Sequence, residues 1–190
     1  MDPNECIART MKFYIETDRL ILRDFLESDV DGLFELDSNP EVHRYLGNNP
    51  IKDVSQILPI IQFVRQQYDE HGIGRWAVLE KKTNAFIGWS GLKFVTETRN
   101  QRINYYDIGY RLIQNYWGKG YATESAQAAL NYGFNEMKLE LICAAAQAQN
   151  LASNNVLQKC GLSLIKPYFE NDVLENWYEI SHAQWLERIP

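Results

Sequence analysis

Residues 107–134 read DIGYRLIQNYWGKGYATESAQAALNYGF, and the architecture of the chain can be worked out from this stretch. Apolar and polar residues alternate from Asp107 to Ile113, as they do in a half-buried strand. The following segment, Gln114 to Gly120, contains two glycines and predicts a tight turn. From Tyr121 to Met137 apolar residues recur every three or four positions, which predicts a helix. The stretch is therefore expected to form a strand, a glycine loop and a helix.

The glycine loop has the properties of an anion-binding site. The first turn of a helix leaves backbone N–H groups without partners and carries the positive end of the helix dipole. Gly118 and Gly120 have no Cβ, so an anion can approach the backbone, and Lys119 between them adds a full charge. The loop predicts phosphate binding; the alternative is a glycine turn that only starts a surface helix.

Two common phosphate-binding motifs do not fit this loop. A P-loop requires Ser or Thr after its lysine, whereas Lys119 is followed by Gly120. The dinucleotide-binding motif requires Gly or Ala where Thr123 stands, and no acidic residue ends the apolar run at 139–144. Both classes of nucleotide site are therefore excluded.

Three segments together resemble one protein family. Residues 116–125, YWGKGYATES, resemble the acetyl-CoA loop of the GNAT acetyltransferase superfamily, and in particular its ribosomal-protein N-acetyltransferase (RimJ/RimL-like) branch. Residues 17–46 resemble the opening strand and helix of that branch, and residues 150–162 resemble its second cofactor segment. The chain departs from the pattern at Asn115, where Gln or Arg is usual, and at Leu162, where Phe is usual.

The composition is that of a globular protein. With 190 residues, 45% hydrophobic and 23% charged, the chain is expected to form one domain over residues 1–190, of which 1–12 show no pattern and form a loose N-terminal segment. The net charge of −6 argues against a nucleic-acid-binding surface and fits a basic acceptor, although such a charge also serves solubility alone.

The cysteines and the hydropathy pattern predict the compartment. Cys6, Cys143 and Cys160 show no C-x-x-C spacing and leave an odd count, which predicts neither a metal site nor a disulfide framework. No apolar run approaches the length of a membrane span, and the N-terminus has no signal-peptide pattern. A cytoplasmic protein with no membrane partner is expected.

The remaining pattern predicts an α+β domain with a mixed, mostly antiparallel central sheet flanked by helices. Strands are expected at 19–25, 75–80, 85–95, 104–113, 139–146, 162–167 and 177–182. Helices are expected from the capping residues 27–29 to the break at Asn39-Pro40, and at 41–46, 53–68, 121–137 and 152–159. Pro59 is expected to split the third helix. His43 is expected on the surface of the second, with a contact to the substrate as the alternative. The resemblance implies the GNAT fold, whose strands splay at the acetyl-CoA site.

The resemblance implies that the chain uses acetyl-CoA as a cosubstrate. The pyrophosphate is then expected on the loop and the first helical turn, that is, on Trp117, Gly118, Lys119, Gly120, Tyr121, Ala122 and Thr123. Pantetheine is expected to pair with the strand edge from Ile113 back towards Tyr110, and a backbone N–H near Leu112 is expected to polarise the thioester carbonyl. Asn150 is expected to donate to a pantetheine carbonyl.

Proton transfer is assigned to two candidates. Asp107 is the first candidate for the base, with Tyr105, Tyr106 and Glu97 as its partners, although each side chain fits equally on a solvated face. Many superfamily members use a tyrosine as acid to the leaving thiolate, but Leu157 stands at that position. Ser153 offers the nearest hydroxyl in its place; alternatively it only starts a helix, and the thiolate leaves without an acid.

These residues lead to one function with two alternatives. An acetyl-CoA-dependent N-acetyltransferase acting on a primary amine, above all on a protein or peptide N-terminus, is expected. The first alternative acceptor is a polyamine, an antibiotic or an amino acid: an acidic cleft favours a polyamine, and an open groove favours a peptide. The second alternative is a non-catalytic acyl-CoA-binding module. Dimers are common in the superfamily, so a homodimer is a candidate assembly, although no stretch indicates an interface.

Overall fold

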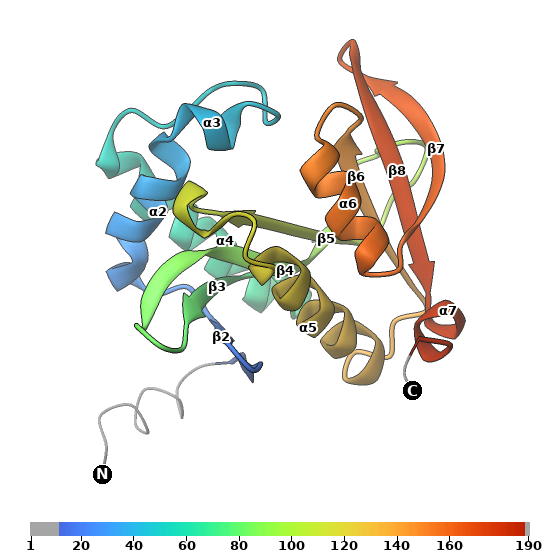
Figure 1. Cartoon of the computed structure of the whole chain (residues 1–190), viewed down its shortest axis with the longest axis horizontal. Helices are drawn as coiled ribbons and strands as arrows, with labels where there is room; N and C mark the ends of the chain where they lie inside the picture. The colour runs from blue at the N-terminus through green and yellow to red at the C-terminus, as the bar shows by residue number, and fades with distance from the viewer. Residues whose placement is uncertain (1–11, 189–190) are drawn as a thin grey trace.

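One eight-stranded sheet runs through the computed structural model, which describes residues 12–188 (Figure 1). The strand order is β1-β2-β3-β4-β5-β6-β8-β7. The strands are β1 (Tyr14–Glu16), β2 (Leu20–Arg23), β3 (Arg75–Glu80), β4 (Ala85–Val95), β5 (Tyr105–Leu112), β6 (Leu141–Gln147), β7 (Ser163–Glu170) and β8 (Val173–Ser181). All neighbours are antiparallel except β5 and β6, which confirms the mixed, mostly antiparallel sheet.

Helices cover the sheet on both faces. They are α2 (Val30–Ser38), α3 (Pro40–His43), α4 (Ile57–His71), α5 (Tyr121–Asn135), α6 (Leu151–Lys159) and α7 (His182–Leu186), with short 3-10 turns at Glu27–Asp29, Val54–Gln56 and Gln114–Tyr116. Figure 1 shows α2, α3 and α4 grouped over the N-terminal strands, with α6, β7 and β8 on the opposite side of the molecule. The two groups are joined through β5 and α5.

Separate apolar clusters connect the sheet to its two groups of helices. Ile108 and Leu112 belong to a cluster with α5, whose Ala126, Leu130 and Phe134 are fully buried. Leu33, Leu36, Ile57 and Ile61 of α2 and α4 form a second cluster, together with Ile113, which directly follows β5. The predicted helical period of α5 is thus confirmed, because its apolar stripe packs against the sheet.

The sheet opens between β5 and β6. Strand β5 pairs with β4 along its whole length, from Tyr105 with Val95 to Leu112 with Gly88. With β6 it shares a single pair, Asp107 with Cys143, and beyond this pair the two strands separate. The expected splay of a GNAT fold is present at the point where the glycine loop begins.

The open edge belongs to alternate residues of β5. The N–H of Ile113 donates to the carbonyl of Ile87 on β4, at 2.9 Å. Because backbone groups in an antiparallel pair point to the partner at every second residue, the N–H groups of Leu112 and Tyr110 point away from β4. They face the space that β6 leaves free.

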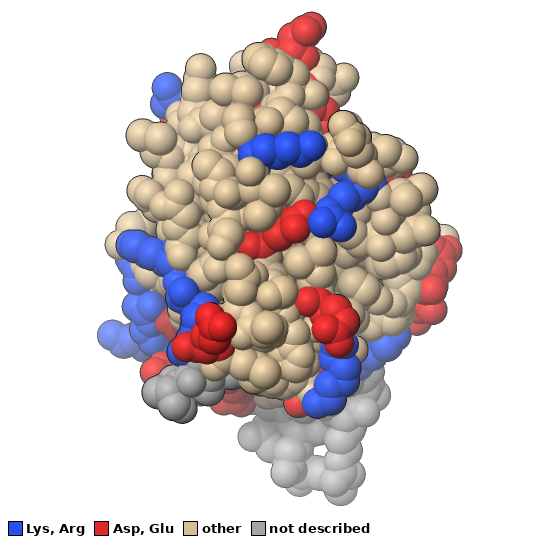
Figure 2. All heavy atoms as spheres, turned by 90° about the vertical axis from the view of Figure 1, so that its right-hand side faces the viewer, with Lys and Arg blue, Asp and Glu red and all other residues tan. Residues whose placement is uncertain are grey.

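The last strand, β7, forms an edge of the sheet and exposes apolar side chains. Leu164, Ile165 and Phe169 are 48%, 52% and 74% exposed. Figure 2 shows this side of the molecule, where Lys and Arg are interspersed with Asp and Glu and no field of one sign covers the face.

Several sequence expectations need correction. Pro59 does not split α4, because it is the third residue of that helix, where no backbone N–H needs an intrahelical partner. His43 is buried rather than on the surface, at 7% exposure. Strand β1 and helix α7 were not expected; they are three and five residues long, too short to give a periodic signal.

The remaining expectations concern residues that the structure does not describe, membrane-spanning helices and metal sites. Cys6 and residues 1–11 of the expected N-terminal segment lie outside the described residues. Within residues 12–188 no helix is both long and apolar enough to cross a membrane. In the same range no group of three or more His, Cys, Asp or Glu side chains is arranged to hold a metal ion.

Candidate active site

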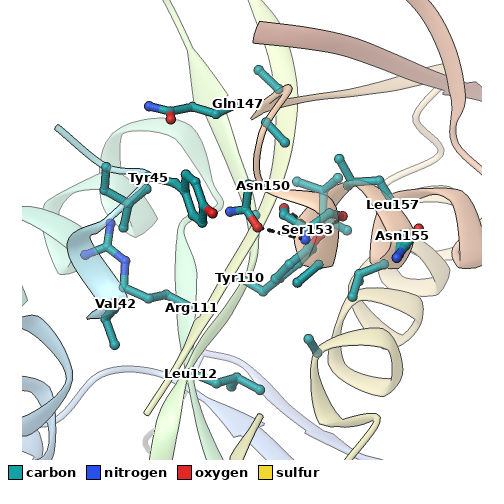
Figure 3. A pocket seen from close by; sticks show the side chains of 18 of the residues that line it. Val42, Tyr45, Tyr110, Arg111, Leu112, Gln147, Asn150, Ser153, Asn155 and Leu157 are labelled. Atoms are coloured by element: carbon teal, nitrogen blue, oxygen red, sulfur yellow. Dashed lines mark hydrogen bonds between the residues drawn. The ribbon is translucent and has the colours of Figure 1, made fainter. Parts of the chain in front are cut away.

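A cleft of about 1040 Å³ occupies the splay between β5 and β6 (Figure 3). It is bounded by the α3 region, β5, the glycine loop, α6 and the β7–β8 hairpin. Figure 3 shows Tyr45 and Asn150 facing each other across this cleft, from the segment after α3 and from the start of α6. The residues expected from sequence are thus gathered around one space.

Both loop glycines have backbone conformations that favour glycine. The φ angles are +73° at Gly118 and +83° at Gly120, in the left-handed region. Gly120 precedes α5 as its N-cap and has no side chain to accept from the first-turn N–H groups. These N–H groups are therefore open to an anionic ligand, as the sequence predicts.

Arg19 ties the loop to the N-terminal strands. Its Nη1 donates to the carbonyl of Lys119 at 2.9 Å, and its Nε donates to Glu124 at 2.6 Å. The guanidinium also lies over the ring of Tyr121, at 4.6 Å. Glu124 is in the first turn of α5, where a carboxylate is favoured by the helix dipole. This contact was not anticipated because 105 residues separate its partners.

The loop side chains have partners of their own. The ammonium of Lys119 lies 5.0 Å from the ring of Tyr116, and the hydroxyl of Tyr121 donates to Glu80 at 2.6 Å. Ala122 and Thr123 line the cleft from the first turn of α5. The Tyr121 hydroxyl is thus tied to β3, and the expected cofactor contacts of Lys119, Tyr121, Ala122 and Thr123 stay predictions.

Of the two residues expected to bind the cofactor at the end of β5, Leu112 has a backbone N–H that faces the splay and Ile113 does not. The indole of Trp117 donates to the carbonyl of Leu112 at 2.7 Å, which fixes the open end of β5 and leaves the Leu112 N–H facing the splay. Ile113 differs, because its N–H donates to Ile87 and its carbonyl accepts from Tyr116. Ile113 thus has partners for both backbone groups, and its side chain is buried in the second cluster.

Helix α6 brings polar groups to the other wall. The Oδ1 of Asn150 accepts from the N–H of Ser153 at 3.1 Å, so its Nδ2 is the part of the amide free to donate. The hydroxyl of Tyr110 lies 3.1 Å from the Oγ of Ser153 and 2.9 Å from its carbonyl oxygen. Burial raises the pKa of the Tyr110 phenol far above its ordinary value. Leu157, one turn further on, is buried and offers no hydroxyl.

Asp107 is held in an ion pair. The guanidinium of Arg75 donates to the Asp107 carboxylate and, at 2.7 Å, to its carbonyl oxygen, and both side chains are nearly buried, at 11% and 13% exposure. Gly109 leaves room for this guanidinium, since a Cβ there would lie 2.7 Å from Nη2. Burial lowers the pKa of Arg75, and the carboxylate opposes that shift. The role of Asp107 as a base stays a prediction, because one of its carboxylate oxygens already accepts from Arg75.

Glu175 on β8 was missed by the sequence reasoning. It lines the cleft, is 8% exposed and makes no hydrogen bond or ion pair with another side chain of residues 12–188. Burial raises the pKa of its carboxyl above the ordinary value, and Glu170 adds to this effect while Arg99 opposes it. The sequence around Glu175 is polar and resembles a turn, so its pattern did not indicate a strand residue beside the cleft.

Strand register assigns the site residues to two faces of the sheet. Asp107 pairs with Cys143, so Arg111 and Gln147, each four residues further on, lie on the same face as that pair. Glu175 pairs with Gln147 and shares this face. Tyr110 lies on the opposite face, against α6. The glycine loop and α6 thus form one side of the splay, and Arg111 and Glu175 form the other.

Known proteins share this arrangement. The family model described as "Acetyltransferase (GNAT) domain" matches residues 19–163. A Bacillus subtilis (strain 168) protein bearing the name uncharacterized N-acetyltransferase YoaA is 33% identical over 147 residues, which is 77% of this chain and 81% of that protein. A GNAT-family acetyltransferase crystal structure from Bacillus anthracis is 26% identical with a TM-score of 0.74, over 90% of this chain and 99% of that one.

A more distant structure extends the fold comparison. RimL, a ribosomal L7/L12 α-N-protein acetyltransferase crystallised with coenzyme A, is 20% identical with a TM-score of 0.73 over 89% of this chain and 98% of that one, and it shows the fold alone. The splayed sheet, the glycine loop at the start of α5 and the matched family description agree. The chain therefore belongs to the GNAT acetyltransferase family and is an acetyl-CoA-dependent N-acetyltransferase.

Proposed function

We propose that this enzyme acetylates the α-amine of a protein or peptide N-terminus, as a member of the RimJ/RimL-like branch. The observation that carries the proposal is the splay itself, with open N–H groups of β5 beside α6. On the other side lies the buried carboxylate of Glu175, which has no side-chain partner among residues 12–188. The branch is supported by the motif in residues 116–125 and by the likeness of the fold to RimL.

The residues of the splay fit acetyl-CoA, which supplies an activated acetyl thioester when bound. The backbone of Gly118 to Thr123 offers its N–H groups to the pyrophosphate. The N–H groups of Tyr110 and Leu112 extend the sheet edge to pantetheine, and that of Leu112 donates to the thioester oxygen. The Nδ2 of Asn150 donates to a pantetheine carbonyl.

Glu175 takes the proton from the acceptor amine. An α-ammonium group has a pKa of about 8 and must lose a proton before it can attack the thioester. The raised pKa of Glu175 brings its basicity closer to that of the amine, and Arg99, the guanidinium that opposes this shift, is paired with Glu170. Asp107 remains a second candidate, although Arg75 holds its carboxylate.

The Ser153 hydroxyl stabilises the leaving thiolate by hydrogen bonding, and Tyr110 positions it, because the single O–H of Tyr110 donates to the Ser153 carbonyl. A thiol has a pKa of about 8.5, so a phenol whose pKa burial has raised above its ordinary value stays protonated beside a thiolate. Ser153 receives support from the Tyr110 hydroxyl at 3.1 Å. This pair compensates for the missing tyrosine at Leu157, and the chain needs no full proton transfer at this step.

The charge of the cleft disfavours a polyamine. Charged residues of both signs line its acceptor part: Arg44, Arg75, Arg99 and Arg111 against Glu41, Asp107, Glu170 and Glu175. An acceptor with two or more ammonium groups meets as many guanidinium groups as carboxylates there. A peptide N-terminus presents a single ammonium group and fits this balance better.

Thiol release from acetyl-CoA tests the proposal, with peptides, polyamines, aminoglycosides and amino acids as acceptors. Wild type is expected to turn over peptides fastest, and Glu175→Gln is expected to retain coenzyme A binding by calorimetry while losing most turnover. Faster turnover of polyamines or aminoglycosides would contradict the assigned acceptor. Coenzyme A binding without turnover of any amine would instead favour a non-catalytic acyl-CoA-binding module.

A further inference from the structure

A row of charged and aromatic side chains crosses the face of the sheet that carries Arg111 and Glu175, here called the acceptor face. Trp89 on β4 pairs with Arg111 on β5, and its ring lies 5.1 Å from the Arg111 guanidinium and 5.5 Å from that of Arg75. Arg75 continues the row to Asp107, and Arg111 continues it to Asp37 of α2, at 2.6 Å. Each guanidinium thus has a carboxylate on one side and the indole on the other.

The two arginines differ in how many of their donors are used. Arg75 donates to the carbonyls of Gly91 and Asp107 and to the Asp107 carboxylate. Arg111 makes one hydrogen bond within residues 12–188, from Nη1 to Asp37. A guanidinium carries five N–H donors, so Arg111 keeps its Nε and Nη2 donors for the cleft that it lines. Its side chain is 22% exposed.

Arg111 is held rigidly although most of its donors are free. Asp37 is 4% exposed, and His43 approaches the same Oδ1 atom at 3.6 Å. The Trp89 ring supports the flat side of the guanidinium. A planar fork that is fixed in this way loses little freedom when it binds a carboxylate with two parallel hydrogen bonds.

Arg111 lies across the splay from Glu175. Arg111 and Gln147 are each four residues beyond the single β5–β6 pair, and Gln147 pairs with Glu175. All three side chains share the acceptor face, at the same level of the sheet. Glu175 and Arg111 both line the cleft, so an acceptor in the splay meets a carboxylate on one side and a guanidinium with free N–H donors on the other. Figure 3 shows Arg111 and Gln147 at this cleft.

We infer that Arg111 binds an anionic group of the acceptor, so that the preferred acceptor carries a carboxylate close to the amine that is acetylated. The inference rests on the proposed acetyl transfer with Glu175 on the amine side. Two sources offer this chemistry: the α-carboxylate of a free amino acid, or an acidic side chain in the first residues of a peptide. A bare polyamine offers neither.

Matched acceptor pairs test the inference on the full chain. The first pair is L-methionine with L-methioninamide, and the second is a pentapeptide beginning with Asp and the same peptide beginning with Asn. The wild type is expected to prefer the carboxylate member of at least one pair by about tenfold or more in kcat/KM. The first pair identifies a free amino acid as the source, and the second identifies an acidic peptide.

Three variants locate the preference. Arg111→Gln is expected to remove it through a raised acceptor KM, and Arg111→Lys is expected to restore it in part, since charge remains without the fork. Arg102→Gln is the matched control, because Arg102 is also paired with one carboxylate, Glu179, but lies outside the cleft lining. The double variant Asp37→Asn/Arg111→Gln removes both charges and covers the case in which Arg111→Gln alone fails to fold.

Failure of the inference differs from failure of the proposed function. Equal turnover of both members of each pair, or a preference that survives in the Arg111 variants, would overturn the role of Arg111 and leave N-terminal acetylation intact. Activity that is insensitive to Glu175→Gln would contradict the proposed chemistry instead. Calorimetric binding of coenzyme A by each variant shows that its cofactor side is folded.

Discussion

Glu175 is the residue on which the proposed chemistry depends most. We expect Glu175→Gln to lower kcat/KM at pH 7 roughly 10²-fold, because general base catalysis contributes on that order. The acid limb of the wild-type pH–rate profile is expected to vanish in this variant. Glu136→Gln, at an exposed glutamate after α5, is the control. A normal acid limb in Glu175→Gln would assign the base elsewhere.

The same substitution is expected to stabilise the fold at neutral pH. The pKa of Glu175 is raised in the folded protein, so the folded state binds this proton more tightly than the unfolded chain. Wild-type stability therefore falls as pH rises from the unfolded pKa, about 4.3, through the folded pKa. Glu175→Gln is expected to raise Tm at pH 7 and to lose this gain near pH 4. A gain that is constant between these pH values would contradict the assigned burial effect.

Asp107 is expected to matter for stability more than for proton transfer. Asp107→Asn leaves the Arg75 guanidinium nearly buried without its carboxylate, at a cost of about 3 kcal/mol or more in the free energy of unfolding. Urea unfolding measures this loss, with Glu16→Gln in the exposed pair with Lys81 as a control expected to cost under about 1 kcal/mol. If Asp107→Asn has the same free energy of unfolding as the wild type but its pH–rate profile lacks the acid limb, Asp107 is the base.

At the level of elements, the cofactor loop depends on its attachment to the N-terminal strands. Arg19→Gln removes the hydrogen bonds to Lys119 and Glu124, so we expect a KM for acetyl-CoA raised by about fivefold or more with little change in kcat. Lys81→Gln, which breaks a nearby ion pair outside the loop, is the control. Equal effects of the two variants would show that the loop does not depend on Arg19.

The elements that sequence predicted well are those defined by local pattern. The strand, loop and helix around Gly118 and Gly120 follow from period and turn residues, which are read within one segment. The splay came from family resemblance, because no local pattern encodes the loss of pairing beyond Asp107 and Cys143. The ion pair of Arg75 with Asp107 joins residues 32 positions apart, and Glu175 reaches the cleft only through the β7–β8 hairpin. Such contacts are tertiary and lie beyond a single-sequence reading.

At the level of the whole molecule, the proposed reaction keeps its two substrates on opposite sides of the sheet. The glycine loop and α6 lie on one side of the splay, and Arg111, Trp89 and Glu175 lie on the other, so the two substrates meet only where β5 and β6 part. This arrangement explains how one cofactor scaffold serves different acceptors. One domain over residues 1–190 and a homodimer stay predictions.

The account rests on the claim that the cofactor lies along the open edge of β5. Amide hydrogen exchange followed by NMR, with and without coenzyme A, tests it residue by residue. We expect coenzyme A to slow exchange at Tyr110 and Leu112 at least about tenfold beyond any uniform stabilisation, because their N–H groups gain a partner. Ile113, whose N–H already donates to Ile87, is expected to show only the uniform change. Equal slowing at Ile113, or unchanged exchange at Tyr110 and Leu112 with coenzyme A bound, would contradict the account.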